Sequence, residues 1–297
     1  MMTVTSTTNM GRGAAPTVAP RRASERRRAG TLAAYRWELV KLAALIRTRA
    51  MLIGCLVAPP LVVAILRSQR PPADTLFGRL IHQSGYAVPL LLLGFLTQWV
   101  FPLLTSLVAG DIFASEDQHG TWKTILTRSV SRAQLFWAKT LAAVTFAVAV
   151  FVVLAASTMI SSVLLVGRQP LTGLTGQTIA PGTALVLVTT AWLVTLPPLI
   201  GFTALSILLS VRTRNPALGV VGPVVIGLAM GLLGSVGGIG LLRRALLTTA
   251  LESWHGLFAA RAFAGPLVQG VVVSALWTTI CLAFAYSSLR RRDITGG

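Results

Sequence analysis

The sequence contains very little charge. Asp, Glu, Lys and Arg make up only 11% of its 297 residues, while 54% are hydrophobic and the mean hydropathy is +0.74. In a soluble domain about a quarter of the residues are charged. The composition therefore excludes an ordinary soluble domain, and it predicts an all-α protein that crosses a membrane several times.

Six long stretches have no charged residue at all or carry one only at their edge. Each reaches or approaches the roughly 17–25 residues that a spanning helix needs, although the first is short and would have to borrow from its flanks. We therefore predict one membrane domain over residues 50–290. Its six transmembrane helices are expected at 50–66, 87–109, 138–166, 183–210, 217–242 and 266–289. Because intramembrane charges serve ion-driven carriers, their absence argues against that class.

Lysine is almost absent, with three in the chain, and a phosphate-binding loop is missing. Lys123 and Lys139 each precede a threonine, but Trp122 and Ala138 stand where such a loop needs glycine. The chain is therefore not expected to be an enzyme on its own, and any ATP that it depends on would be hydrolysed by another chain.

Cysteine and histidine are also rare. The two cysteines, Cys55 and Cys281, lie in predicted spans, where free buried thiols are expected rather than a disulfide framework. The three histidines are scattered at positions 82, 119 and 255. We predict no metal site, and no nucleophile stands near a base at an interpretable spacing. No catalytic residue is therefore assigned.

Positive charge is distributed unevenly between the two sides of the predicted bundle. The segments on the side of the N-terminus hold 19 of the 26 Lys and Arg residues. Since positively charged flanks stay in the cytoplasm, both termini are predicted to be cytoplasmic in a multi-pass protein of the cytoplasmic membrane. This distribution accounts for most of the net charge of +18 without a nucleic-acid partner. The preference for Arg over Lys, with abundant Ala, Val and Leu, suggests a bacterial origin.

The segments outside the spans differ in character. Residues 1–30 form a basic tail with too little apolar surface to fold, and it fixes the topology or contacts anionic membrane lipids. Residues 291–297 form a short cytoplasmic tail. Residues 31–49 predict an amphipathic interfacial helix, or else a plain extension of the first span. Its expected apolar face consists of Tyr35, Leu39, Leu42 and Ile46.

The connection between the second and third spans, residues 110–139, has dense internal order. Asp111, Glu116 and Asp117 place three of the eight acidic residues within seven positions. The second helix is expected to end at His119-Gly120, because glycine adopts the left-handed conformation that ends helices. The acidic cluster is either a solvated face or part of a binding surface.

A short amphipathic helix is predicted next, beginning at the capping residue Thr121. Its apolar residues Trp122, Ile125 and Leu126 are expected to face the membrane domain, opposite Lys123 and Arg128. Ser131 then begins the third span with a capping box to Gln134. Three helix boundaries so close together predict a stiff corner at the membrane edge.

These residues resemble those of the membrane permease subunits of type-2 ABC exporters. Members carry a glutamate four residues before Gly-Thr, then a leucine-rich turn, a Pro-Val-Ser-Arg step and a lysine entering the third span. Here these places are filled by Glu116, Gly120, Thr121, Leu126, Val130, Ser131, Arg132 and Lys139, with Ser129 where the proline is frequent. The resemblance covers this segment strongly and the six-span layout generally.

The resemblance implies a six-span permease domain whose short cytoplasmic coupling helix docks into an ATPase. Two ATPase subunits would bind ATP and Mg²⁺, a second permease copy or paralogue would complete the pathway, and a small amphipathic molecule, drug or lipid-like substrate would be exported. The residues expected to couple to the ATPase are Glu116, Asp117, Gly120, Thr121, Lys123, Arg128, Ser131 and Arg132. The alternatives are a membrane-embedded enzyme of lipid or envelope metabolism and a non-transporting anchor or sensor.

Two further patterns concern packing. The glycines Gly227, Gly231, Gly234 and Gly238 in the fifth span would allow a close helix approach, either within the chain or in a dimer. In the outer loop 243–265, apolar residues at helical spacing form one stripe, which predicts a short helix or helical hairpin at the outer interface. A plain surface loop is the alternative. That stripe consists of Leu247, Leu251, Trp254 and Phe258.

Overall fold

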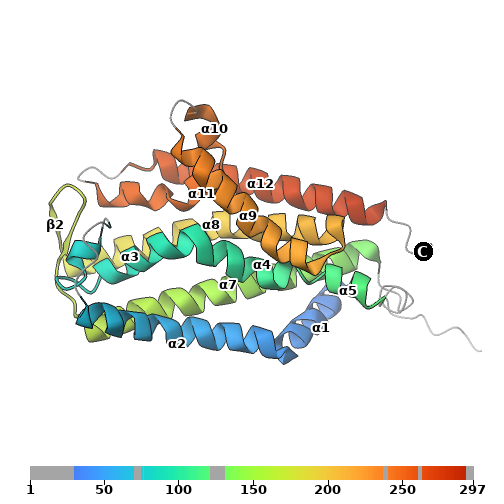
Figure 1. The fold of residues 1–297 in the computed structure, drawn as a ribbon, viewed down its shortest axis with the longest axis horizontal. Coiled ribbons are helices and arrows are strands. Elements are labelled where there is room, and N and C mark those ends of the chain that lie inside the picture. The colour runs from blue at the N-terminus through green and yellow to red at the C-terminus, as the bar shows by residue number, and fades with distance from the viewer. Residues whose placement is uncertain are drawn as a thin grey trace, which may run out of the picture.

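The protein is an elongated bundle of long helices that run along a common direction (Figure 1). The computed structural model describes residues 30–69, 75, 77–120, 131–236, 240–259 and 263–291. Within these ranges, six helices are long and apolar enough to cross a membrane, and the sheet consists of one two-stranded hairpin. The predicted all-α, six-span fold class is confirmed.

The six spans lie close to their predicted positions. The second keeps its predicted ends, and the first gains four residues at its start and two at its end. The fifth stops at Ser235 rather than 242, because the chain turns extended at Val236 and continues as the separate helix α10 (Gly240–Arg244). The spans are α2 (Ile46–Ser68), α3 (Ala87–Phe95) with η2 (Leu96–Val100) and α4 (Phe101–Ala109), α7 (Arg132–Leu165), α8 (Pro181–Thr213), α9 (Pro216–Ser235) and α12 (Gly265–Arg290).

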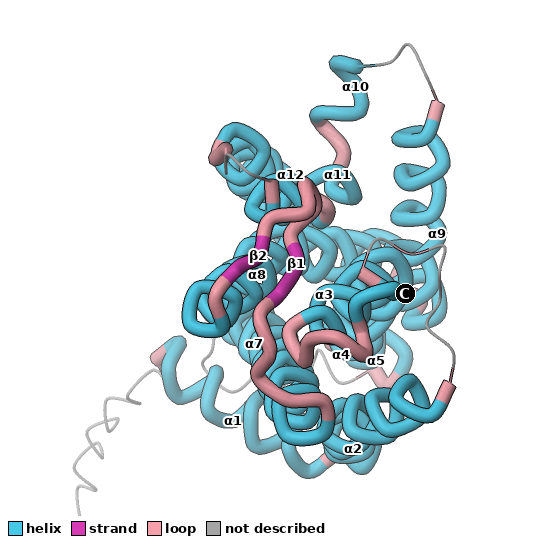
Figure 2. Tube along the Cα trace, turned by 90° about the vertical axis from the view of Figure 1, so that its left-hand side faces the viewer, coloured by secondary structure: helices cyan, strands magenta, loops and turns pink. Residues whose placement is uncertain are grey.

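The bundle has two distinct ends (Figure 1). At the corner end lie helix α1 (Thr31–Ala44), helix α5 (Ala114–Gln118), the turn between α8 and α9, and the last described residues. At the hairpin end lie η1 (Gly78–Leu80) and the strands β1 (Leu171–Thr172) and β2 (Thr178–Ile179), which cross the ends of α7 and α8 (Figure 2). The sequence did not predict this hairpin, whose strands are only two residues long.

The predicted stripe in the outer loop is buried rather than interfacial. Helix α11 (Leu247–Leu251) and the 3₁₀ helix η3 (Ser253–Phe258) pack against α8 and α12. The side chains of Leu247, Leu251, Trp254 and Phe258 are at most 1% exposed. The plain-loop alternative is therefore wrong, and the helical prediction is confirmed. The backbone N–H of Leu174 donates to the carbonyl of Phe258, which joins the β-hairpin to this loop.

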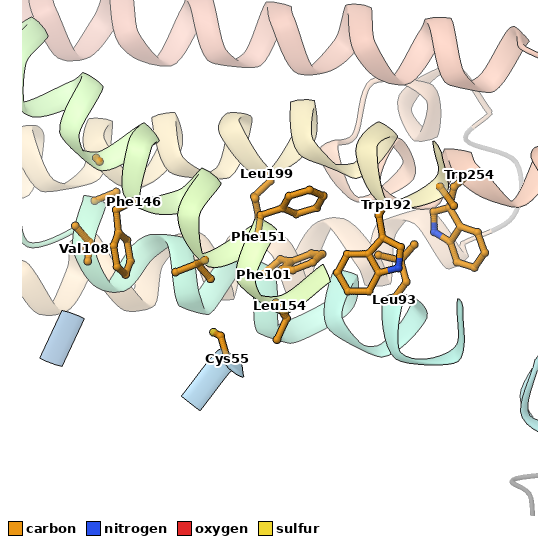
Figure 3. Packing of buried hydrophobic residues seen from close by; sticks show 14 of the residues in the cluster. Cys55, Leu93, Phe101, Val108, Phe146, Phe151, Leu154, Trp192, Leu199 and Trp254 are labelled. Atoms are coloured by element: carbon orange, nitrogen blue, oxygen red, sulfur yellow. The ribbon is translucent and has the colours of Figure 1, made fainter. Parts of the chain in front are cut away.

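Helix α8 forms the centre of the core. Its Trp192 lies against Phe101 of α4 and Phe151 of α7, with ring centroids 6.1 and 5.9 Å apart (Figure 3). Pro197 and Pro198 lie inside this helix, as Pro59 and Pro60 lie inside α2. Because Pro60 has no N–H, it leaves the Leu56 carbonyl without a helical partner. The Ser157 hydroxyl of α7 donates to that carbonyl at 2.6 Å, so the polar group remains satisfied within the bundle.

A close backbone contact joins Gly110, at the end of α4, to Gly219 of α9 at the corner end. A Cβ added at either glycine would overlap the backbone of the other. Ser206 of α8 donates to the Gly219 carbonyl at 2.8 Å beside this contact. Not all of the glycines predicted to allow close helix packing lie in contacts. Gly227 faces the Phe202 ring and Gly234 lies near Leu246, while Gly231 faces open space. The fourth member, Gly238, lies outside the described residues.

Substituting Gly219 by Ala should therefore destabilise the protein by about 1–3 kcal/mol or more, because overpacked contacts against backbone cannot relax easily. The matched control is Gly231→Ala in the same helix, where the added methyl group meets no atom within 4 Å. Thermal unfolding of the two purified variants in detergent measures the difference. Equal melting temperatures would show that the α4–α9 crossing does not need a glycine.

Candidate functional site

We call residues 121–130 the coupling segment. The corner end has a helix boundary on each side of it, as the sequence predicts. The helix of the second span ends earlier than expected, at Ala109, but the separate helix α5 ends at Gln118, just before His119-Gly120, and Gly120 has a left-handed φ of +63°. The Ser131 hydroxyl accepts from the Gln134 N–H at 3.2 Å, and the Gln134 side chain accepts from the Ser131 N–H at 2.9 Å. The capping box is therefore confirmed. The intervening coupling residues lie outside the described residues: Thr121, Trp122, Lys123, Ile125, Leu126 and Arg128.

A buried ion-pair network connects the two flanks of this segment. Lys139 of α7 is 0% exposed, and its Nζ atom lies 3.0 Å from Glu116 Oε1 and 2.9 Å from Glu38 Oε1. Glu116 is 3% exposed and also accepts from Lys41 Nζ at 2.5 Å. The order Lys41, Glu116, Lys139, Glu38 alternates in sign. We call these four residues the corner network; their formal charges sum to zero.

The corner network joins three elements that are distant in the sequence. Helix α1 supplies Glu38 and Lys41, while Glu116 comes from α5 and Lys139 from the second turn of α7. Arg47, at the start of α2, forms a further ion pair with Asp111, which follows α4. The polar contacts therefore fix the amphipathic helix and the first span to the chain that leads into the coupling segment.

Helix α1 differs from its predicted pattern. The chain is extended at Leu45, so α1 ends at Ala44 and Ile46 begins α2. Ile46 therefore lies in the next helix and not on the predicted face of α1. Leu42 is buried, and so is Glu38, one helical turn before it. No local pattern identifies the residue that neutralises Glu38, because Lys139 lies about a hundred residues away in the sequence.

Glu116, expected to couple to the ATPase, is buried in the network and is therefore not part of an exposed polar surface. Asp117 is half-buried, and Arg132 is also half-buried and donates to the Arg290 carbonyl at 3.2 Å. Arg132 therefore ties the start of α7 to the end of α12. Gln118, His119, Gly120 and Ser131 are the exposed residues on either side of the coupling segment.

The electrostatics of the network favour rigidity over stability. Removing two charges from water costs several kcal/mol per ion, and their mutual attraction offsets this cost only with good geometry. Each buried charge here has a partner of opposite sign within 3.0 Å. Other arrangements of α1, α5 and α7 would leave one of these charges unpaired. The network therefore specifies one arrangement of the corner.

The described residues contain no group of three His, Cys, Asp or Glu side chains that could hold a metal ion. An enzyme at this end would have to use the clustered polar residues Asp111, Glu116, Asp117 and His119. Asp111 and Glu116 are both engaged in ion pairs. The His119 ring is hydrogen-bonded to the Ser115 carbonyl at 2.6 Å.

Comparison with known protein families gives one match. The model of the family described as ABC-2 family transporter protein matches residues 36–234, which include the whole corner network and nearly all of the first five spans. No curated protein matches the chain.

Proposed function

The chain belongs to the ABC-2 family of transporter proteins, whose members are membrane subunits of ABC transporters, and on this premise we propose that it is the permease subunit of an ATP-driven exporter. The ATPase is a separate chain that docks at the corner end. The observation that carries the proposal is the corner network, which fixes both flanks of the coupling segment to the membrane helices.

The corner network would transmit motion of the coupling segment to the membrane helices. A partner that moves residues 121–130 would move Gly120 and Ser131, which flank them. Glu116 lies four residues before Gly120, and Lys139 lies eight residues after Ser131, so both flanks meet in the same ion pairs. Through Glu38 and Arg47 the motion would reach α1 and α2 as well. ATP binding and hydrolysis in the partner would thereby switch the permease between inward and outward access.

The membrane orientation follows from the distribution of charge. We place the corner end and both termini in the cytoplasm of a bacterium, since the corner end carries most of the Lys and Arg residues. The hairpin end then faces outward, and the exposed apolar belt between the ends contacts membrane lipids. In this orientation the coupling segment is accessible to a cytoplasmic ATPase, which binds the ATP and Mg²⁺.

The assembly contains two ATPase subunits and a second permease, either a copy of this chain or a paralogue. Helix α9 stands at the edge of the bundle (Figure 2) and leaves Leu218, Val221 and Val225 about half exposed. A second permease would cover such a surface. The substrate is a small amphipathic molecule, a drug or a lipid-like compound, as expected for uncharged spans.

The test is transport by the intact complex. The tagged chain should co-purify with an ABC ATPase, and proteoliposomes containing both should export substrate only when ATP is hydrolysed. The control is the same complex with the phosphate-loop lysine of the ATPase replaced by Ala. Activity of the purified chain without any ATPase would instead indicate an envelope enzyme, and association without flux would indicate an anchor or sensor.

A further inference from the structure

A cavity of about 350 Å³ opens toward the hairpin end, away from the corner network. One wall is formed by α3 and the π-helical turn η2, and the opposite wall is formed by the loop that contains η3. A π-helical turn inserts an extra residue into a helix and often marks a functional site. Here the turn supplies Thr97 and Gln98 to the cavity.

Glu252 is the one acidic side chain among the described residues that line this cavity, beside the neutral polar groups of Thr75, Thr97 and Gln98. Glu252 is exposed at the rim, and among the described residues no cation pairs with its carboxylate. His255 Nδ1 lies 2.7 Å from the Glu252 carbonyl, which can only accept, so Nδ1 donates to it and, in the neutral ring, Nε2 is an acceptor. No Lys or Arg is among the described lining residues.

Aromatic side chains form the apolar part of the cavity. Trp254 stacks on His255 with ring centroids 3.9 Å apart and lies against Phe77 at 6.1 Å. Since Trp254 is only 1% exposed, it holds the imidazole in a fixed position. Phe95 is 52% exposed and leaves a free ring face at the opposite wall. Aromatic faces attract cations, and most strongly where water is excluded.

A second cavity is lined by residues of the opposite charge. It is also about 350 Å³ in volume, but Arg243 and Arg244 line it, together with Thr249 and Gln269. Residues 252–255 of the outer loop line the first cavity and residues 243–250 line the second, so the first carries a negative charge and the second two positive charges. The negative charge of the first cavity is therefore local and does not reflect the whole end of the bundle.

We propose that the cavity at Glu252 binds an organic cation that has a flat or aromatic apolar body. The Glu252 carboxylate would pair with the cationic group, and the exposed ring of Phe95 would contact the apolar body. That this ligand is the exported substrate rests on the proposed function. The binding itself does not depend on the proposed function, because the cavity is formed by this chain alone.

Binding of tetraphenylphosphonium tests the proposal, with tetraphenylborate as an ion of the same shape and opposite charge. The full chain, without ATPase, is placed in nanodiscs of uncharged lipid, and binding is measured by equilibrium dialysis against empty nanodiscs. We expect saturable binding of the phosphonium only. Glu252→Gln should weaken it by about fivefold or more, whereas Glu252→Asp should retain most of it.

The matched control is Thr178→Lys on the exposed β-hairpin, which changes the net charge by the same amount outside the cavity. Equal weakening by this control and by Glu252→Gln would overturn the proposal, because surface potential alone would then explain the binding. Equal binding of the borate, or no saturable binding, would also overturn it. None of these results bears on ATP-dependent transport, so the two proposals fail separately.

Discussion

Replacing Lys139 by Met is expected to lower the free energy of unfolding by about 3–5 kcal/mol, because Glu38 and Glu116 would remain buried without the cation between them. The methionine has a similar length and is apolar, so little packing is lost. The measurement is thermal unfolding of the purified protein in detergent. A fall in Tm on the order of 10 °C is expected, by the scaling observed for domains of 150–250 residues.

Lys41→Met provides the control, because Lys41 contacts the same Glu116 oxygen but its side chain is 48% exposed. Glu116 keeps Lys139 as a buried partner in this variant, and a half-exposed cation contributes about 1 kcal/mol or less, so the protein should melt close to the native one. The triple variant Lys139→Met with Glu38→Gln and Glu116→Gln should recover much of the loss, since it leaves no uncompensated carboxylate. If the triple variant melts as low as the single one, the effect comes from packing and not from charge.

The features that the sequence predicted correctly depend on residues close together in the chain. The spans follow from local hydropathy, the end of α5 from one glycine, and the start of α7 from a serine and a glutamine three residues apart. The outer-loop helices follow from a periodic apolar stripe. In each case the physical cause acts within one or two helical turns, so a single sequence contains the necessary information.

The features that the sequence missed depend on contacts between distant elements. Glu116 was assigned to an exposed surface because acidic residues in a loop are usually solvated, but Lys139 and Lys41 remove it from water. Gly110 and Gly219 look unremarkable in isolation, and only the crossing of α4 and α9 makes both of them necessary. The β-hairpin has too few strand residues to give a pattern. Each miss reflects a tertiary partner that no local rule identifies.

The burial of Glu116 changes which residues should test docking of the ATPase. Variants of Glu116 or Arg132 would alter the bundle itself, since one belongs to the corner network and the other holds the end of α12. Lys123 and Arg128 are better suited, because the sequence places them on the polar face of the coupling segment. Their removal should affect the partner and leave the fold intact.

The double variant Lys123→Ala, Arg128→Ala is expected to reduce ATP-dependent transport by about 100-fold, because losing two charged contacts at an interface costs several kcal/mol. Its Tm should match that of the native chain, in contrast to Lys139→Met. Transport is measured in proteoliposomes, and ATPase binding by co-purification.

The control is Arg212→Ala with Arg214→Asn, which removes two positive charges from the exposed α8–α9 turn at the same end of the bundle. Asparagine is chosen because Arg214 has a left-handed φ of 55°, a conformation that asparagine tolerates. If both double variants lose transport equally, overall charge at the corner end governs the interaction, and the assignment of the coupling segment, residues 121–130, as the ATPase-binding site fails. If only the first loses transport while its Tm is unchanged, the corner network and the coupling segment have separate roles: the network holds the junction rigid, and the segment binds the ATPase.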